Sequence, residues 1–193
     1  AIGGDATCVF NLERRQQELG HKVFILTANC RDIAGKKNLY KFGVSDFSYR
    51  WDYVTLKRII SLLLLPWQGF WLLRKIKPDI IHTHSADIGF LISFWAKLLG
   101  IPVVNTCHSL SFPHRFMSPF KRYPEYFCLR FGLFTAIDAV DRVSAEYLRA
   151  YKIRRCVEVP MLGVDTEEFN SVNARIKADK KKTPVIFLFA GRL

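Results

Sequence analysis

Short apolar runs alternate along the chain with longer segments whose apolar positions recur at helical spacing. The short runs are rich in β-branched residues, which is typical of strands buried on both faces of a parallel sheet. We expect strands at 22–27, 39–44, 80–84, 101–106, 139–143, 157–160 and 185–189, and helices at 6–19, 52–77, 85–99, 126–136 and 145–151. This alternation predicts an α/β fold: a Rossmann-like, doubly wound parallel sheet with helices on both faces.

Breaks in the helical pattern support these boundaries. Gly20 and Gly100 stand where glycine commonly ends a helix, and Pro78 interrupts the long helical region. Ligands of doubly wound folds bind beyond the carboxyl ends of the strands. We therefore expect the functional residues to follow the strands directly.

The composition provides enough apolar residues for a core and gives the chain a strong positive charge. The 193 residues are 50% hydrophobic and 24% charged, which supplies a sizeable core and argues against general disorder. Lysine and arginine number 29 against 17 acidic residues, a formal net charge of +12. A surplus of this size favours anionic partners: nucleic acid, an anionic membrane or phosphorylated substrates.

The cysteine and histidine patterns indicate the cellular compartment and whether the protein binds a metal. The five cysteines are odd in number and include no Cys-x-x-Cys pair, so we expect reduced thiols and a cytoplasmic location. The five histidines form no His-Glu-x-x-His motif. We expect neither a metal nor another cofactor.

The longest apolar stretch, 59–73, has two interpretations. It contains Pro66, Gln68 and Gly69 and falls short of the roughly 20 apolar residues that span a bilayer. It is either a buried helix or a surface helix that dips into an anionic membrane interface, flanked by basic residues on both sides. The aromatic and basic stretch 112–122 supports the second interpretation, a peripheral membrane protein.

Glycine and arginine mark two candidate anion sites. The Gly3-Gly4 turn precedes a helix, where backbone amides can approach an anion closely, although such a turn can also merely start the helix. Arg192 directly follows the last expected strand, a place where its planar guanidinium can bind a phosphate through two hydrogen bonds.

Histidines follow two neighbouring strands. His82 and His84 share one face of their strand, and Ser85 follows in the loop. They form either a polar wall for a substrate hydroxyl or a pair of satisfied polar residues at a strand end. His108 leaves the next strand, where a titratable ring can meet a ligand. Three histidines could hold a metal, but no carboxylate has the expected spacing.

Several segments in this order resemble family-four GT-B glycosyltransferases. They are the Gly3-Gly4 turn, 19–23, 77–84, 100–104 with His108, 139–146, 163–165 and 189–193. The resemblance implies two Rossmann-like domains facing across a cleft. It further implies that a sugar is transferred from a nucleotide-sugar donor with retention of anomeric configuration and without an essential metal. Together with the basic, aromatic helical region, it favours a lipid-linked or other membrane-proximal acceptor, such as a glycan.

The resemblance also implies a domain organisation. Residues 1–173 would form the N-terminal acceptor-binding domain without its first strand, 174–183 a basic linker, and 184–193 the first strand of the nucleotide-sugar domain. The chain alone is then expected to be inactive, because the remainder of the donor domain would lie beyond it.

Individual roles follow from the matched motifs. Gly3, Gly4 and Arg192 would contact the donor diphosphate. His108 would be the catalytic residue beside the donor sugar. His84 and Ser85 would contact the acceptor. One departure is Met161-Leu162 before Gly163, where the family usually has Asn.

Two other functions remain open at this point. A related GT-B nucleotide-sugar epimerase would share the N-terminal pattern and differ in the C-terminal half. A nucleic-acid-binding domain would explain the charge, but the Lys and Arg residues are scattered and no recognition motif is present, so we expect no nucleic acid partner.

Overall fold

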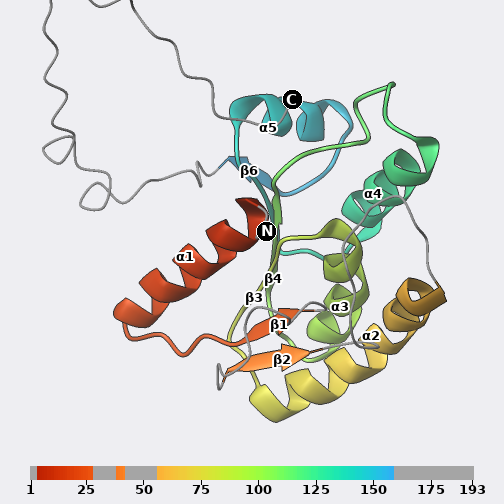
Figure 1. The fold of residues 1–193 in the computed structure, drawn as a ribbon. Helices are drawn as coiled ribbons and strands as arrows, with labels where there is room; N and C mark the ends of the chain where they lie inside the picture. Colours follow the sequence, from red (N-terminus) through yellow and green to blue (C-terminus); the bar gives the residue numbers. More distant parts are fainter. Residues whose placement is uncertain (1–3, 28–37, 42–55, 159–193) are drawn as a thin grey trace, which may run out of the picture. The chain divides into compact units, whose positions relative to one another are not determined.

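A computed structural model describes residues 4–27, 38–41 and 56–158 (Figure 1). The helices are α1 (Gly4–Glu18), α2 (Leu56–Ile76), α3 (Ala86–Leu98), α4 (Pro119–Phe131) and α5 (Arg142–Ala150). The strands are β1 (Ile25–Thr27), β2 (Leu39–Lys41), β3 (Ile81–Thr83), β4 (Val103–Cys107), β5 (Ala136–Ala139) and β6 (Cys156–Glu158).

The chain divides into two compact units, 1–162 and 163–193. The second unit, the expected linker 174–183 and the expected strand 185–189 all lie outside the described residues, as does the expected domain boundary at 173.

The described strands form two parallel sheets. β1 pairs with β2, and the other four strands lie in the order β3-β4-β5-β6. In the larger sheet each strand lies beside the one that precedes it, and a helix connects each successive pair. Because parallel crossovers are right-handed, this order places α3, α4 and α5 on one face of the sheet. The predicted α/β fold with parallel strands alternating with helices is confirmed.

Glycines end two helices as expected. Gly20 follows α1 with φ 87° and Gly100 follows α3 with φ 72°, both in the left-handed region that glycine adopts without strain. Helix α2 ends at Ile76, one residue before Lys77-Pro78, and it runs continuously through Pro66. Among the helices that the structure describes, none is long and apolar enough to cross a membrane.

The strand expected at 139–143 is wrong, because a helix cap occupies part of it. The strand is Ala136–Ala139, and α5 begins at Arg142. The side chain of Asp141 accepts hydrogen bonds from the Ser144 amide and the Ser144 hydroxyl, both at 2.8 Å. These bonds satisfy an amide at the helix start and hold the pKa of Asp141 below its ordinary value.

The helix expected at 126–136 is also displaced. Helix α4 begins earlier, at Pro119, which suits the first helical position because its missing N–H has no intrahelical partner there. It ends before Gly132. A Cβ at Gly132 would lie 2.2 Å from the Phe134 ring, so the buried Phe134 packs where a larger residue would collide.

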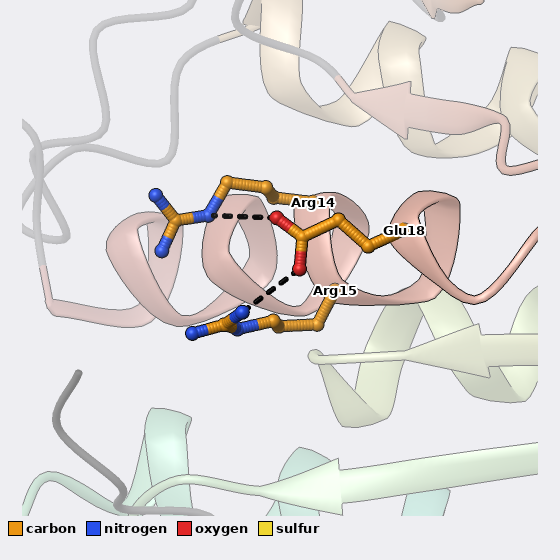
Figure 2. A network of polar contacts seen from close by, with 3 residues as sticks. All are labelled: Arg14, Arg15 and Glu18. Carbon is orange, nitrogen blue, oxygen red and sulfur yellow. Dashed lines mark hydrogen bonds and ion pairs between the residues drawn. The ribbon is translucent and has the colours of Figure 1, made fainter. Parts of the chain in front are cut away.

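Helix α1 carries an ion-pair network on its surface (Figure 2). Arg15 donates a hydrogen bond of 2.8 Å to Glu18, and the Arg14 guanidinium lies 4.0 Å from the other oxygen of the same carboxylate. The pairs span three and four residues, the spacing at which helical side chains are neighbours. Each exposed pair of this kind stabilises a helix by only about a few tenths of a kcal/mol.

The core is formed by the larger sheet and by side chains of α2, α3, α4 and α5. Its largest fully buried apolar side chains are Phe134, Leu65, Ile137, Leu148 and Val103. Helix α3 approaches the sheet most closely at Gly89. A Cβ there would lie 2.6 Å from Thr83 Oγ1 and 2.9 Å from the Phe134 ring. The missing side chain therefore sets the spacing between helix and sheet.

Two glycine substitutions separate the effect of this close helix–sheet spacing from the effect of helix propensity. Gly89→Ala should lower the free energy of unfolding by about 1–3 kcal/mol, because the added methyl group overpacks the core. Gly69→Ala, inside α2, should raise it by about 0.5–1 kcal/mol, because its Cβ meets Ile92 at an ordinary 3.7 Å and alanine favours the helix. Urea unfolding followed by circular dichroism measures both. A Gly89→Ala protein as stable as Gly69→Ala would contradict the close approach.

Candidate functional site

Strand register sorts the polar residues of the sheet onto two faces. Thr83 is paired with Asn105, and Thr106 is paired with Asp138. Because side chains alternate along a strand, Thr83 and Asn105 point to one face while His82, Thr106 and Asp138 point to the other. The first face is the one covered by α3, since Gly89 contacts both Thr83 and Asn105. The second face carries the candidate site.

The three expected histidines lie together at the carboxyl ends of β3 and β4. The ring centroids of His82 and His84 are 4.4 Å apart, and those of His84 and His108 are 5.1 Å apart in a stacked arrangement. His84 Nδ1 is 2.8 Å from His108 Nε2, a hydrogen-bond distance. Residues that follow neighbouring strands therefore do meet, as the parallel arrangement predicts.

A hydrogen-bonded chain leads from this cluster into the protein. The Thr106 hydroxyl donates to Asp138 Oδ2 at 2.9 Å, and His82 Nε2 lies 2.6 Å from the same hydroxyl. A threonine hydroxyl has one proton, and here the carboxylate accepts it. The hydroxyl must therefore accept from His82, so His82 carries a proton on Nε2.

Asp138 is the buried end of this chain. Its side chain is 4% exposed, and among the described residues its Oδ1 has no hydrogen-bond partner. A buried carboxylate oxygen without a partner is costly, so the hydrogen bond from Thr106 matters more than an exposed one would. The negative charge raises the pKa of His82, against the larger effect of burial.

Burial keeps the inner histidines neutral. It lowers the pKa of His82, and it lowers that of His84 to about 3, with the neighbouring His82 and His108 rings adding to the effect. Neutral imidazoles donate and accept single hydrogen bonds, which suits them to substrate hydroxyls. They are poorly suited to neutralising a diphosphate.

Ser85 lies beside the cluster at the start of α3. It is the N-cap residue, and its hydroxyl donates a short hydrogen bond to Asp87 Oδ1, which also accepts from the Ile88 amide at 2.9 Å. The structure therefore brings His84 and His108 together, whereas the Ser85 hydroxyl is bonded to Asp87. Gly4 is the first residue of α1, whereas Gly3 and Arg192 lie outside the described residues.

A half-buried acid fixes the loop that follows His108. Glu125 of α4 accepts hydrogen bonds from the backbone amides of Ser111 and Phe112, at 2.6 and 2.8 Å. Burial raises the pKa of Glu125, and these two hydrogen bonds oppose the rise. Arg122 donates to the Phe112 carbonyl at 3.2 Å. Helix α4 thus ties down the segment that carries His108 out of the sheet.

Other chemistries find less support at this edge. Burial, with the negative charge of Glu125, raises the pKa of the Cys107 thiol to about 12, so it is not a nucleophile near neutral pH. Within 4–27, 38–41 and 56–158, no three His, Cys, Asp or Glu residues are arranged to hold a metal ion.

Sequence reasoning missed Thr106, Asp138 and Glu125. Asp138 stands inside the apolar run Ala136–Ala139, and a lone acid in a buried strand is a signal of a site or a buried network. The expected strand at 139–143 left it outside the sheet. Glu125 gives no comparable signal, because one acid on an amphipathic helix is ordinary.

The sequence profile of Glycosyltransferase Family 4 matches residues 2–168. The chain belongs to glycosyltransferase family 4. This confirms the resemblance drawn from the ordered motifs and favours a glycosyltransferase over the epimerase and the nucleic-acid binder.

One curated relative is similar over part of the chain. It is the UDP-Gal:alpha-D-GlcNAc-diphosphoundecaprenol alpha-1,3-galactosyltransferase of Escherichia coli, 43% identical over 58 residues. The match covers 30% of this chain and 13% of that enzyme.

Two solved structures are similar in fold. Acinetobacter baumannii MurG superposes with a TM-score of 0.52 at 11% identity, over 86% of this chain and 44% of MurG. The UDP complex of MnaA from S. aureus reaches a TM-score of 0.40 at 16% identity, over 64% of this chain and 36% of that protein, a likeness too low to carry an argument. The MurG match confirms that this chain has the fold of one half of a GT-B protein. The chain spans less than half of MurG.

Removing the Thr106 hydroxyl should disturb both stability and the His82 tautomer. Thr106→Val keeps the side-chain volume but leaves the buried carboxylate without a donor, which should lower the free energy of unfolding by about 1–3 kcal/mol. It should also release His82 from its Nε2–H form, a change visible in nitrogen-15 NMR of the imidazole ring.

Thr83→Val is the matched control, because Thr83 bonds Asn105 at 2.8 Å on the opposite face. It should destabilise the protein without moving the His82 nitrogen signals. An unchanged His82 tautomer in Thr106→Val would contradict the hydrogen-bonded chain.

Acid should destabilise the fold through His84. The pKa of His84 is lowered in the folded protein from 6.5 to about 3, so the unfolded chain binds this proton first. The free energy of unfolding should therefore fall as the pH drops from about 7 toward about 4. Urea unfolding at several pH values should show a shallower fall in His84→Asn. His21→Asn, on an exposed position, is the control and should leave the slope unchanged.

Proposed function

We propose that this chain is the acceptor-side half of a retaining glycosyltransferase that moves a hexose from a nucleotide-sugar to a lipid-linked acceptor. Family membership and the GT-B fold support sugar transfer. The observation that carries the choice of site is the meeting of His84 and His108 at the carboxyl edge of the parallel sheet, where doubly wound folds bind ligands. Ser85 follows His84 directly in the chain.

The galactosyltransferase relative supports the choice of substrates. Its name specifies UDP-galactose as donor and a sugar linked to diphosphoundecaprenol as acceptor. We propose the same general classes of substrate for this chain: a nucleotide-diphosphate sugar as donor and a lipid-linked glycan as acceptor.

The proposed roles follow from the electrostatics of the site. His108 faces the donor sugar at the reaction centre, and its bond with His84 holds the ring plane. Neutral His84, with Ser85, receives acceptor hydroxyls. Charge develops on the diphosphate leaving group during transfer, and Arg192 with the Gly3 and Gly4 amides would stabilise it there.

We also propose that the reaction takes place in the cytoplasm, at the face of a membrane. Cys107, Cys128 and Cys156 are free thiols, as in reducing compartments. The chain spans 44% of MurG, so under this proposal the donor-side residues are supplied by sequence outside these 193 residues, and the chain alone is inactive.

The test is sugar transfer by the full-length protein. A panel of radiolabelled nucleotide-sugars is offered with undecaprenyl diphosphate-linked N-acetylglucosamine, and NMR of the product reports whether the anomeric configuration is retained. His108→Ala should reduce kcat/KM by roughly 100-fold or more, as loss of a group acting in the transition state does.

His114→Ala is the matched control. His114 lies in the loop after β4 and packs edge-on against Tyr147, at 5.7 Å between ring centroids. It should retain most of the activity. Wild-type turnover in His108→Ala would remove His108 from the mechanism, and absence of transfer with every donor would overturn the proposed function.

A further inference from the structure

Helix α2 exposes apolar side chains on the side where a surface helix is normally polar. Leu63, Trp67 and Trp71 recur every four residues, and the two tryptophans are 62% and 55% exposed. The other side of the helix is buried through Leu65 and Leu73. An amphipathic helix of a water-exposed protein places charged residues opposite its buried stripe. Here both sides are apolar.

Helix α4 repeats this arrangement. Phe120, Phe127 and Phe131 are 90%, 51% and 57% exposed, while Cys128 and Leu129 are buried. Single exposed apolar residues are normal, but the same helix presents three aromatic rings. Two helices of one layer therefore leave large apolar side chains outside the core.

Helix α3 joins the two. It packs against both α2 and α4 (Figure 1). Phe70 of α2 lies 4.8 Å from Trp95 of α3, and Phe90 of α3 lies 5.6 Å from Phe127 of α4, measured between ring centroids. Phe94 of α3 is itself 52% exposed. We call Trp67, Trp71, Phe94, Phe120, Phe127 and Phe131 the aromatic face.

The charged side chains in the last turns of α2, α3 and α4 are all basic. Arg74 and Lys75 end α2, Lys97 ends α3, and Arg130 ends α4. The Arg74 guanidinium lies 5.6 Å from the Phe70 ring and that of Arg130 lies 5.8 Å from the Phe131 ring, so cations and aromatic rings are adjacent.

The acidic residues of the same helices do not offset this charge at the surface. Asp87 and Glu125 are both half-buried, and each carboxylate accepts hydrogen bonding from backbone amides. The outer surface of α2, α3 and α4 is therefore aromatic and basic, the composition of segments that lie in the interface of an anionic bilayer.

We infer that the aromatic face is a docking surface for an anionic lipid bilayer. Tryptophan and phenylalanine would enter the boundary between headgroups and acyl chains, and Arg74, Lys75, Lys97 and Arg130 would meet the phosphates. A second copy of this chain fits less well, because pairing the same face would bring like charges together.

This inference deepens the proposed function, since a lipid-linked acceptor is held at a membrane, but its test needs no sugar transfer. The 193-residue chain is co-sedimented with vesicles of phosphatidylcholine alone or mixed with phosphatidylglycerol. We expect binding to the mixed vesicles that weakens with salt, and a blue shift of tryptophan fluorescence on binding.

Variants separate the two contributions. Trp67→Gln with Trp71→Gln should reduce the vesicle partition coefficient by at least about tenfold, since two large apolar side chains no longer leave water. Arg74→Gln with Lys75→Gln should reduce the preference for anionic over neutral vesicles. Leu19→Gln is the matched control: an apolar residue, 76% exposed, at the end of α1, whose loss should leave binding unchanged.

Thermal unfolding confirms that each variant is folded, and Phe120→Gln, at a 90% exposed position, provides a second variant should the tryptophan pair fail to fold. Undiminished vesicle binding by the folded variants would overturn the inference. So would self-association that these variants abolish in the absence of vesicle binding. Loss of sugar transfer with intact vesicle binding would count against the proposed function alone.

Discussion

The buried carboxylate of Asp138 is the constraint around which the carboxyl edge of the sheet is organised. Its side chain accepts a hydrogen bond from the Thr106 hydroxyl, and that hydroxyl then accepts one from His82. One proton therefore fixes the polarity of three side chains on three adjacent strands. Ring contacts and a ring-to-ring hydrogen bond extend this order to His84 and His108.

Strand alternation lets this polar chain coexist with a dry core. On the helix-covered face of β4 and β5, Val103 and Ile137 are buried among apolar neighbours, and Asn105 is buried in a hydrogen bond with Thr83. The alternate residues along the two strands, which include Thr106 and Asp138, face the other way. Shifting either strand by one residue would exchange the two sets, placing a carboxylate under the helices. The site and the core thus specify the same register.

The sequence predicts the strand–helix order and the meeting of three histidines, because both follow from periodicity and from the parallel arrangement. It fails where a local cap or a steric contact decides. The Asp141 cap turns an apolar run into the start of a helix, and directly after α4 the Phe134 ring occupies the space that a side chain at Gly132 would need. The hydrogen bond between Thr106 and Asp138 joins residues 32 positions apart, and local pattern carries no information about such a pair.

The net charge of +12 and the histidine site serve different kinds of recognition. Burial keeps His82 and His84 uncharged near neutral pH, so the site offers hydrogen bonds of defined direction rather than a positive field. The positive charge resides on lysine and arginine, several of them at the ends of α2, α3 and α4 beside exposed aromatic rings. A cation attracts any anion from a distance, whereas a fixed neutral imidazole discriminates between hydroxyl positions at contact. Attraction to an anionic surface can therefore change by mutation of exposed arginines without altering which hydroxyls the buried histidines accept.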